Sequence, residues 1–266
     1  MRPGSGPAGT MPGRTLALWF ALLVTTCFAG VDYLRGGMLA GEGRPGLDDL
    51  PLVEVRAGTG EAHDVMAVML TGDGGWGFLD RRIGHELARA GIPAVGWNSL
   101  RYYWRGRTPD EAAADLQRIL DRYGAAWHKR RFLLVGYSFG ADALPFLVNR
   151  LRPEVRSRIV GVSLVAIGRD AAFRFHPTDW VKWRRPTRFL TVPEVRRLAG
   201  FPVTCIYGVR DGATQVSCPQ LRGTGIRVFA LPGGHHFDGA YRRVAGLVLQ
   251  TLRVLPIAPR GPVLAR

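Results

Sequence analysis

Cysteine is scarce in this 266-residue chain, which has three: Cys27, Cys205 and Cys218. No group of Cys, His and Asp residues has the spacing of a metal site, so we expect no metal and no other cofactor. The chain also has no zinc-finger spacing, no RNA-binding aromatic motif and no basic heptad helix. These absences argue against nucleic acid as the partner.

Acidic residues are in short supply as well. The chain has 21 Asp and Glu against 36 Lys and Arg, which gives a formal net charge of +15. The cations lie in short scattered clusters, such as residues 129–131 and 184–185, rather than in one tail. A coding bias towards arginine would explain them without any function. Among functional explanations, the charge favours an anionic phospholipid partner and peripheral contact with a membrane.

The composition gives no sign of general disorder. Hydrophobic residues make up 47% of the chain and charged residues 21%, so it can bury enough apolar surface to offset the entropy lost on ordering. Its length fits a single α/β domain of about 200–250 residues. Neither length nor composition predicts an oligomeric state.

The first 34 residues have the pattern of an export signal. A basic stretch ends at Arg14, and the apolar run of residues 16–24 and then small residues such as Ala29 follow it. We expect residues 1–34 to be a signal peptide cleaved near Ala29. An uncleaved anchor is the alternative, because the apolar stretch can be extended to Leu34. Either way, the rest of the chain is expected in the periplasm.

The folded domain is expected at residues 52–256, after a Gly- and Pro-rich linker at 35–51 and before a flexible tail at 257–266. Apolar runs alternate with helical patterns, which predicts a mostly parallel, doubly wound α/β sheet with helices on both faces. The expected strands are Val65–Leu70, Ile92–Gly96, Phe132–Val135, Ile159–Ala166, Val203–Tyr207 and Ile226–Leu231. The expected helices are Leu79–Ala90, Glu111–Tyr123, Ala141–Leu151 and Tyr241–Val254. The second of these helices has a capping threonine, Thr108, followed by Pro109.

Residues 168–191 interrupt this alternation. The segment carries the aromatic residues Phe173, Phe175, Trp180 and Trp183, and it is punctuated by two prolines. A long insertion of this kind is either a lid over a site or a surface excursion with a small core of its own. As a lid, its aromatic residues could contact acyl chains or a lipid interface.

The strongest chemical signal is the sequence Gly136-Tyr137-Ser138-Phe139-Gly140. An apolar run precedes it and a helical pattern follows, which is the setting of a nucleophile elbow in an α/β-hydrolase fold. Small residues flank the serine because a Cβ there would clash in so sharp a turn. We therefore expect Ser138 to be a nucleophile at the start of a helix, rather than part of a purely structural turn.

A serine nucleophile needs a base and an acid, which in this fold follow it in the order acid, then histidine. Asp211 comes directly after the expected strand 203–207, and His235 follows the expected last strand and a pair of glycines. Both therefore fall at the strand ends where the triad requires them. His236 is the alternative base, and one of the two adjacent histidines is expected to be spare.

The oxyanion of an acyl-transfer intermediate needs two N–H donors. Phe139, the residue after the serine, would supply one of them. Gly72 or Asp73, in the glycine-rich loop of residues 71–76, would supply the other. The same loop could instead bind a phosphate, but it lacks the Lys-Ser/Thr ending that such a loop requires.

Cys205 and Cys218 are the only cysteines in the expected mature chain, 13 positions apart. In an oxidising periplasm the two can form a disulfide that ties the segment after a strand back to that strand. Two buried free thiols are the alternative.

Several motifs together resemble the VirJ and AcvB family of bacterial virulence proteins. The similar stretches are residues 71–76, 100–104 with 107–109, 136–142, 205–208 with 218–219, and 231–239. The resemblance implies a periplasmic serine hydrolase of the α/β-hydrolase superfamily. AcvB-type members are linked to removing the aminoacyl group from lysyl-phosphatidylglycerol, and VirJ to DNA transfer by a type IV secretion system.

This resemblance suggests where a substrate would bind. A lysyl ammonium group would need a nearby carboxylate, and Asp73, Asp142 and Asp238 are candidates; Trp76 is a further candidate for a substrate contact. The expected reaction is cleavage of the aminoacyl ester of a phospholipid through an acyl-enzyme on Ser138. The alternatives are an esterase or lipase with another exported substrate, and a VirJ-like accessory protein of a secretion system.

Overall fold

The computed structural model describes residues 46–57, 64–174, 189–212 and 216–252. The expected signal segment at 1–34, the tail at 257–266 and the middle of the 168–191 segment lie outside these residues. Within the expected linker, Leu47 and Leu50 are described and are buried against the core. The folded part of the chain therefore begins before Leu52.

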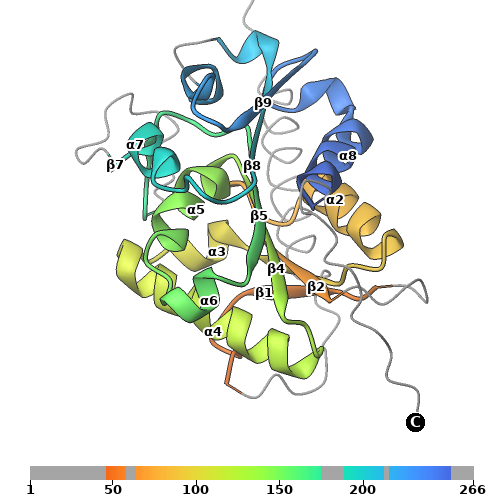
Figure 1. The fold of residues 1–266 in the computed structure, drawn as a ribbon, viewed down its shortest axis with the longest axis vertical. Coiled ribbons are helices and arrows are strands. Elements are labelled where there is room, and N and C mark those ends of the chain that lie inside the picture. Colours follow the sequence, from red (N-terminus) through yellow and green to blue (C-terminus); the bar gives the residue numbers. More distant parts are fainter. Residues whose placement is uncertain (1–45, 58–63, 175–188, 213–215, 253–266) are drawn as a thin grey trace, which may run out of the picture. The chain divides into compact units, whose positions relative to one another are not determined.

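A seven-stranded sheet forms the centre of the fold, in the order β1-β3-β2-β4-β5-β8-β9 (Figure 1). All neighbouring strands pair in parallel except β1, which pairs antiparallel with β3. The strands are β1 (Leu52–Val55), β2 (Val65–Leu70), β3 (Ala94–Trp97), β4 (Arg131–Tyr137), β5 (Ile159–Val165), β8 (Val203–Gly208) and β9 (Arg227–Leu231). The mostly parallel sheet is as predicted, whereas the sequence analysis missed β1.

Helices cover both faces of this sheet, as Figure 1 shows. On one face lie α2 (Phe78–Arg89) and α8 (Tyr241–Leu252), and on the other lie α4 (Pro109–Ala126) and α5 (Phe139–Val148). The short helices are α3 (Ser99–Tyr103), α6 (Pro153–Arg156) and α7 (Thr191–Arg196). Thr108 caps α4 as predicted: its hydroxyl accepts from the Glu111 N–H at 3.2 Å, and the Glu111 carboxylate accepts from the Thr108 N–H at 2.7 Å.

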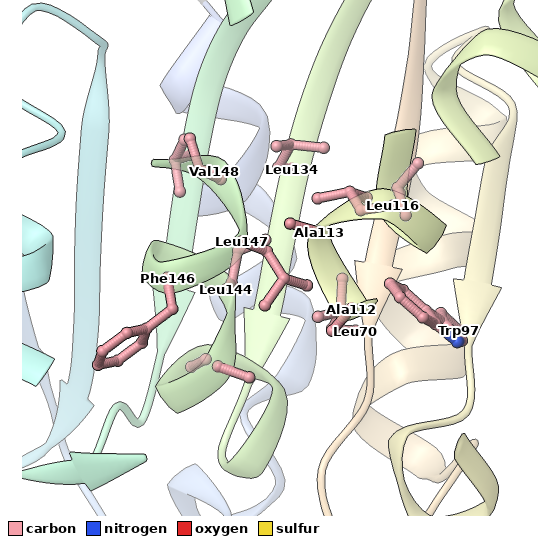
Figure 2. Packing of buried hydrophobic residues seen from close by; sticks show 14 of the residues in the cluster. Leu70, Trp97, Ala112, Ala113, Leu116, Leu134, Leu144, Phe146, Leu147 and Val148 are labelled. Carbon is pink, nitrogen blue, oxygen red and sulfur yellow. The ribbon is translucent and has the colours of Figure 1, made fainter. Parts of the chain in front are cut away.

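Alternating side chains of the strands form two separate cores. In β2, Met66, Val68 and Leu70 pack on the α4 and α5 side, while Val65, Ala67 and Met69 pack on the α2 and α8 side. A strand buried on both faces therefore reads as an uninterrupted apolar run. Figure 2 shows the first of these cores, in which side chains of α4 and α5 meet those of the strands.

The 168–191 segment is anchored to the domain at both ends. Strand β6 (Asp170–Ala171) pairs antiparallel with β7 (Phe189–Leu190). The ring of Phe173 is buried and packs at 5.2–6.0 Å from the rings of Tyr103, Phe146 and Phe189. Phe173 is therefore a core residue and not one that could contact lipid. Phe175, Trp180 and Trp183 lie outside the described residues.

A disulfide joins Cys205 in β8 to Cys218 at the start of the 3-10 helix η3 (Cys218–Leu221), as the sequence analysis expected. Both cysteines are fully buried. Among the described ranges, no helix combines the length and apolar character needed to cross a membrane.

Candidate active site

Ser138 occupies the turn between β4 and α5. Its backbone has φ = +51°, a region that non-glycine residues seldom adopt. The turn is held by hydrogen bonds on both sides: the Ser138 N–H donates to Val165 O at 2.9 Å, and Ser138 O accepts from the Asp142 N–H at 3.0 Å. This conformation, at the N-terminus of a ten-residue helix, is that of a nucleophile elbow.

Two glycines make the elbow possible. A Cβ on Gly136 would lie 2.6 Å from the Cα of Ala141, and one on Gly140 would lie 2.3 Å from the carbonyl oxygen of Leu70. Both neighbours are backbone atoms, which cannot move aside as a flexible side chain can. The steric requirement inferred from the sequence therefore has a specific cause at each position.

His235 lies in the loop after β9, with its Nε2 atom 2.7 Å from the Oγ of Ser138. The loop turns sharply at Gly233, where φ is +98° and a Cβ would lie 2.8 Å from the Asp238 backbone nitrogen. Further along the loop, Phe237 is fully buried and its N–H donates to Gly234 O at 2.8 Å. The base expected from the sequence is thus within hydrogen-bond distance of the serine.

His236 faces a different partner. Its Nδ1 atom lies 2.9 Å from the hydroxyl of Tyr137, and His235 alone of the two has a hydrogen bond to Ser138. The structure therefore places the expected base, His235, at the serine and the alternative, His236, at Tyr137.

Asp211 follows β8 in the short 3-10 helix η2 (Val209–Asp211), next to the histidine loop. The two strand ends are in close contact: a Cβ on Gly208 would lie 2.3 Å from Gly234 O, and the Arg210 N–H donates to Gly233 O at 2.9 Å. The Oδ2 atom of Asp211 lies 3.9 Å from His235 Nδ1, which is an ion-pair distance and too long for a hydrogen bond.

The electrostatics of this pair are dominated by burial. Burial lowers the pKa of His235, and the negative charge of Asp211 partly opposes that shift. Burial likewise raises the pKa of Asp211, and His235 opposes it. A lowered histidine pKa keeps the imidazole neutral at neutral pH, the state in which Nε2 can accept a proton from Ser138.

The expected oxyanion donors lie beside the serine. Phe139 is the first residue of α5, where a backbone N–H has no partner within the helix. Gly72 lies against the elbow, since a Cβ there would be 3.3 Å from the Ser138 Cβ. The loop that carries Gly72 and Asp73 is fixed at both ends: Gly75 N–H donates to Gly72 O at 3.1 Å, and Ser99 N–H donates to the Thr71 hydroxyl at 3.0 Å.

A cavity of about 150 Å³ opens at the serine. Its lining residues are Ser138, Asp142, Ala166, Gly168, Asp211, Val216 and His235. Ala166, Gly168 and Val216 are not among the site residues expected from the sequence. The first two follow β5, and the rule that sites gather at the carboxyl ends of parallel strands could have identified them.

The candidate substrate contacts are dispersed. Asp142 lines the cavity and accepts a hydrogen bond from the Gly168 N–H at 2.6 Å. Asp238 instead forms an ion pair with Arg210 and is absent from the cavity lining. Trp76 packs over Gly84 and Gly96 on the α2 side of the sheet, also away from the lining. Nowhere in the described part of the chain do three or more His, Cys, Asp or Glu residues form a group that could hold a metal.

Solved structures show the same fold. An α/β serine hydrolase homologue from Coxiella burnetii is 16% identical, with a TM-score of 0.53 over 76% of this chain and 90% of that one. Est1E from Butyrivibrio proteoclasticus is 12% identical, with a TM-score of 0.55 over 77% and 96%. A thermophilic esterase from Thermogutta terrifontis is also 12% identical, with a TM-score of 0.54 over 77% and 93%. The chain therefore has the α/β-hydrolase fold.

Comparison with curated proteins gives no significant match. Residues 64–255, in contrast, match the family described as bacterial virulence protein (VirJ). This match spans well over half of the chain, from β2 to α8, and it includes every cavity-lining residue. The chain thus belongs to the VirJ family of bacterial virulence proteins.

Proposed function

We propose that this protein is a serine hydrolase that cleaves a carboxylic ester through an acyl-enzyme on Ser138. The observation that carries the proposal is the 2.7 Å contact between Ser138 Oγ and His235 Nε2 at a strained elbow. A serine that is structural only would not need φ = +51° or a histidine nitrogen within hydrogen-bond distance.

The reaction would proceed in two halves. Ser138 Oγ attacks the ester carbonyl carbon while its proton moves to His235 Nε2, and Asp211 stabilises the imidazolium that forms. The N–H of Phe139 and one N–H of the Gly72–Asp73 loop hold the oxyanion. The intermediate collapses, and His235 returns the proton to the leaving alcohol. Water then attacks the acyl-enzyme while one of its protons moves to His235. The second intermediate collapses, His235 returns that proton to Ser138 Oγ, and the free acid leaves.

The substrate that fits best is the aminoacyl ester of lysyl-phosphatidylglycerol or a related aminoacylated phospholipid. The reaction would take place in the periplasm. Three features support this choice. The net charge of +15 favours an anionic membrane surface. Asp142 places a carboxylate in the cavity beside Ser138, where it could face an ammonium group of the acyl part. The disulfide suits an oxidising compartment.

Release of free amino acid from vesicles tests this function. The full-length protein is incubated with phosphatidylglycerol vesicles that contain lysyl-phosphatidylglycerol, and lysine and lipid are followed by thin-layer chromatography. We expect the wild-type protein to release lysine. In the Ser138→Ala variant the rate of lysine release should be lower by a factor of at least about 10³. Hydrolysis of simple esters without any release of lysine would exclude the aminoacyl-lipid substrate and leave an esterase or lipase with another exported substrate.

Membership of the VirJ family favours one second candidate, an accessory role in a secretion system in which the hydrolase fold only binds. Complementation of a deletion strain separates the two. A Ser138→Ala variant that fully restores the phenotype would establish the binding role, and loss of complementation at normal protein level would support catalysis.

A further inference from the structure

The second histidine of the His235-His236 pair has a partner in the residue that precedes the nucleophile. Tyr137 is the last residue of β4, and only 8% of its surface is exposed. Its hydroxyl lies 3.3 Å from the carbonyl oxygen of His235 and 2.9 Å from Nδ1 of His236. One hydroxyl therefore contacts both histidines, one through the backbone and the other through the ring.

A hydroxyl has a single proton, and this fixes the direction of the hydrogen bonds. If the Tyr137 hydroxyl donates to the His235 carbonyl, its oxygen must accept from His236, which requires the proton on Nδ1. The result is a chain from His236 Nδ1–H to the Tyr137 hydroxyl to the His235 carbonyl. If His236 Nδ1 lacks a proton, it competes with the carbonyl for the hydroxyl, and the link to His235 weakens.

The ring of Tyr137 extends the same link to the oxyanion side of the site. A Cβ on Gly72 would lie 3.3 Å from two carbons of the tyrosine ring. The ring also lies beside His235, with centroids 5.6 Å apart. Tyr137 thus contacts the loop expected to hold the oxyanion and the loop that carries the base, and it is covalently joined to Ser138.

Asp211 does not by itself hold His235 in place. Its Oδ2 atom is 3.9 Å from His235 Nδ1, so no hydrogen bond from the acid fixes the imidazole in this structure. The backbone of His235 is held instead through its carbonyl, by Tyr137.

We propose that Tyr137 and His236 are positioning residues, which act through the His235 carbonyl to hold the base against Ser138. This inference rests on the proposed function, since it assigns a role within the same reaction. Under it the second histidine is not spare: its Nδ1–H frees the tyrosine proton for the His235 carbonyl.

A structural role alone would also place partners around a buried tyrosine hydroxyl, because buried polar groups are normally hydrogen-bonded. The experiment must therefore measure the reactivity of Ser138 separately from stability. The probe is a fluorophosphonate that phosphonylates an activated serine: Ser138 Oγ bonds to phosphorus, fluoride leaves, and His235 takes the proton. Labelling rates and thermal midpoints are measured on the same full-length variants.

The variants are Tyr137→Phe, His236→Ala, His236→Asn and the double Tyr137→Phe/His236→Ala. The side-chain nitrogen of asparagine can occupy the place of Nδ1 and donate to the tyrosine, so it should restore the chain. Tyr123→Phe is the matched control. It removes the hydroxyl of another buried tyrosine, which donates to Glu54 Oε1 at 2.9 Å and lies outside the active site. His85→Ala removes an exposed histidine of α2.

We expect Tyr137→Phe and His236→Ala each to slow labelling about five- to tenfold, which is the effect of losing one ordinary hydrogen bond. The double variant should be no slower than Tyr137→Phe, because both residues act in one chain. His236→Asn should react within about twofold of the wild type, as should both controls.

Two results would overturn the inference while the proposed function survives. In the first, the wild-type protein is labelled, Ser138→Ala is not, and Tyr137→Phe is labelled as fast as the wild type. In the second, thermal midpoints fall but labelling rates of the folded variants do not change. If Tyr137→Phe fails to fold, equal labelling rates for His236→Ala and His236→Asn would contradict the proposed hydrogen-bond chain. No labelling of the wild type would overturn the proposed function and the inference together.

Discussion

The Oδ2 atom of Asp211 is buried 3.9 Å from Nδ1 of His235, and it has no hydrogen-bond partner within the described ranges. An unpaired buried carboxylate oxygen is costly, about 1–3 kcal/mol or more for a charged group. The arrangement is therefore expected to close into a hydrogen bond when His235 becomes positive, because an imidazolium beside the carboxylate satisfies both groups.

Asp211→Asn tests this closure. The amide can keep the shape of the site but cannot stabilise the imidazolium, so we expect kcat for ester hydrolysis to fall by about 10³–10⁴. Asp121→Asn removes an exposed ion pair with Arg152 and serves as the control, with a change below about twofold. A loss of tenfold or less for Asp211→Asn would show that the carboxylate acts only at a distance.

The pH dependence of kcat/KM reports on His235. Burial lowers its pKa, so the neutral, reactive form should persist below the ordinary histidine value of 6.5. The rate should rise with pH, with a midpoint below 6.5, and then reach a plateau. Because Asp211 acts to raise the pKa of His235, Asp211→Asn should move this midpoint to still lower pH. A midpoint above 6.5 in the wild-type protein would contradict the burial argument.

The same shift affects stability in a defined direction. A histidine whose pKa is lower in the folded state binds fewer protons there than in the unfolded chain. The free energy of unfolding should therefore fall as pH drops from 6.5 towards the folded pKa of His235, and His235→Gln should flatten that part of the curve. Urea unfolding at several pH values measures this, and an unchanged slope in the variant would assign the dependence to other groups.

Replacement of an elbow glycine by alanine tests the steric requirement of the turn, and a glycine of α8 serves as the control. Gly140→Ala would place a Cβ 2.3 Å from the Leu70 carbonyl oxygen, so the elbow must distort, and we expect loss of labelling together with a destabilisation of about 3 kcal/mol or more. Gly246 in α8 has open space where its Cβ would lie. Gly246→Ala should leave labelling unchanged and raise stability by up to about 1 kcal/mol, since alanine favours a helix. Equal effects of the two variants would rule out the steric explanation.

The disulfide is testable by reduction. It closes a short loop between positions 13 apart, for which chain entropy predicts a stabilisation of about 3 kcal/mol. In a domain of this size that corresponds to a fall of about 6–12 °C in the thermal midpoint on treatment with reductant. The double variant Cys205→Ala/Cys218→Ala should start near the lower value and not respond to reductant. Because both cysteines are buried, the reductant is added to unfolded protein before refolding. A thermal midpoint that does not fall after this treatment would count against the bond.

Which strands can be predicted from the sequence depends on their length and burial. Strands buried on both faces, such as β2 and β4, read as apolar runs and were found within a few residues. Strand β1 has only four residues, three of them apolar, and Leu52 alone of the four is buried, so the run is too short to recognise as a strand. Its place in the sheet is set by pairing with β3, which is a tertiary contact.

The sequence likewise predicts part of the candidate site. Local backbone chemistry placed Ser138 in an elbow, and topology placed Asp211 and His235 at neighbouring strand ends. Which of two adjacent histidines reaches the serine depends on the loop after β9, where Phe237 and Asp238 both have positive φ. A positive φ is uncommon in residues other than glycine, and the sequence gives no reason to expect it at a phenylalanine. Four of the cavity-lining residues are candidates from the sequence, namely Ser138, Asp142, Asp211 and His235. That Val216 joins them depends on how four separate segments pack together, which is tertiary information.

Substrate recognition is the last point that the structure makes testable, through Asp142. Its Oδ1 atom accepts from the Gly168 N–H at 2.6 Å, a bond that the amide oxygen of asparagine can also form. Asp142→Asn therefore removes the charge from the cavity and keeps this contact. If the carboxylate faces the ammonium of a lysyl group, kcat/KM for the lysyl ester should fall about 10- to 100-fold, which is the effect of one charge-assisted hydrogen bond.

A matched neutral ester provides the comparison for Asp142→Asn. Hydrolysis of an acyl-phosphatidylglycerol with an uncharged acyl group of the same length should stay within about twofold of the wild-type rate. An equal loss on both esters would instead assign Asp142 to holding the Gly168 loop. If neither rate changes, the charge of Asp142 has no part in recognition, and Asp73 becomes the carboxylate to replace next, because its charge acts on His235 and it lies in the loop against the elbow. Asp238 has less claim, since it pairs with Arg210 outside the cavity.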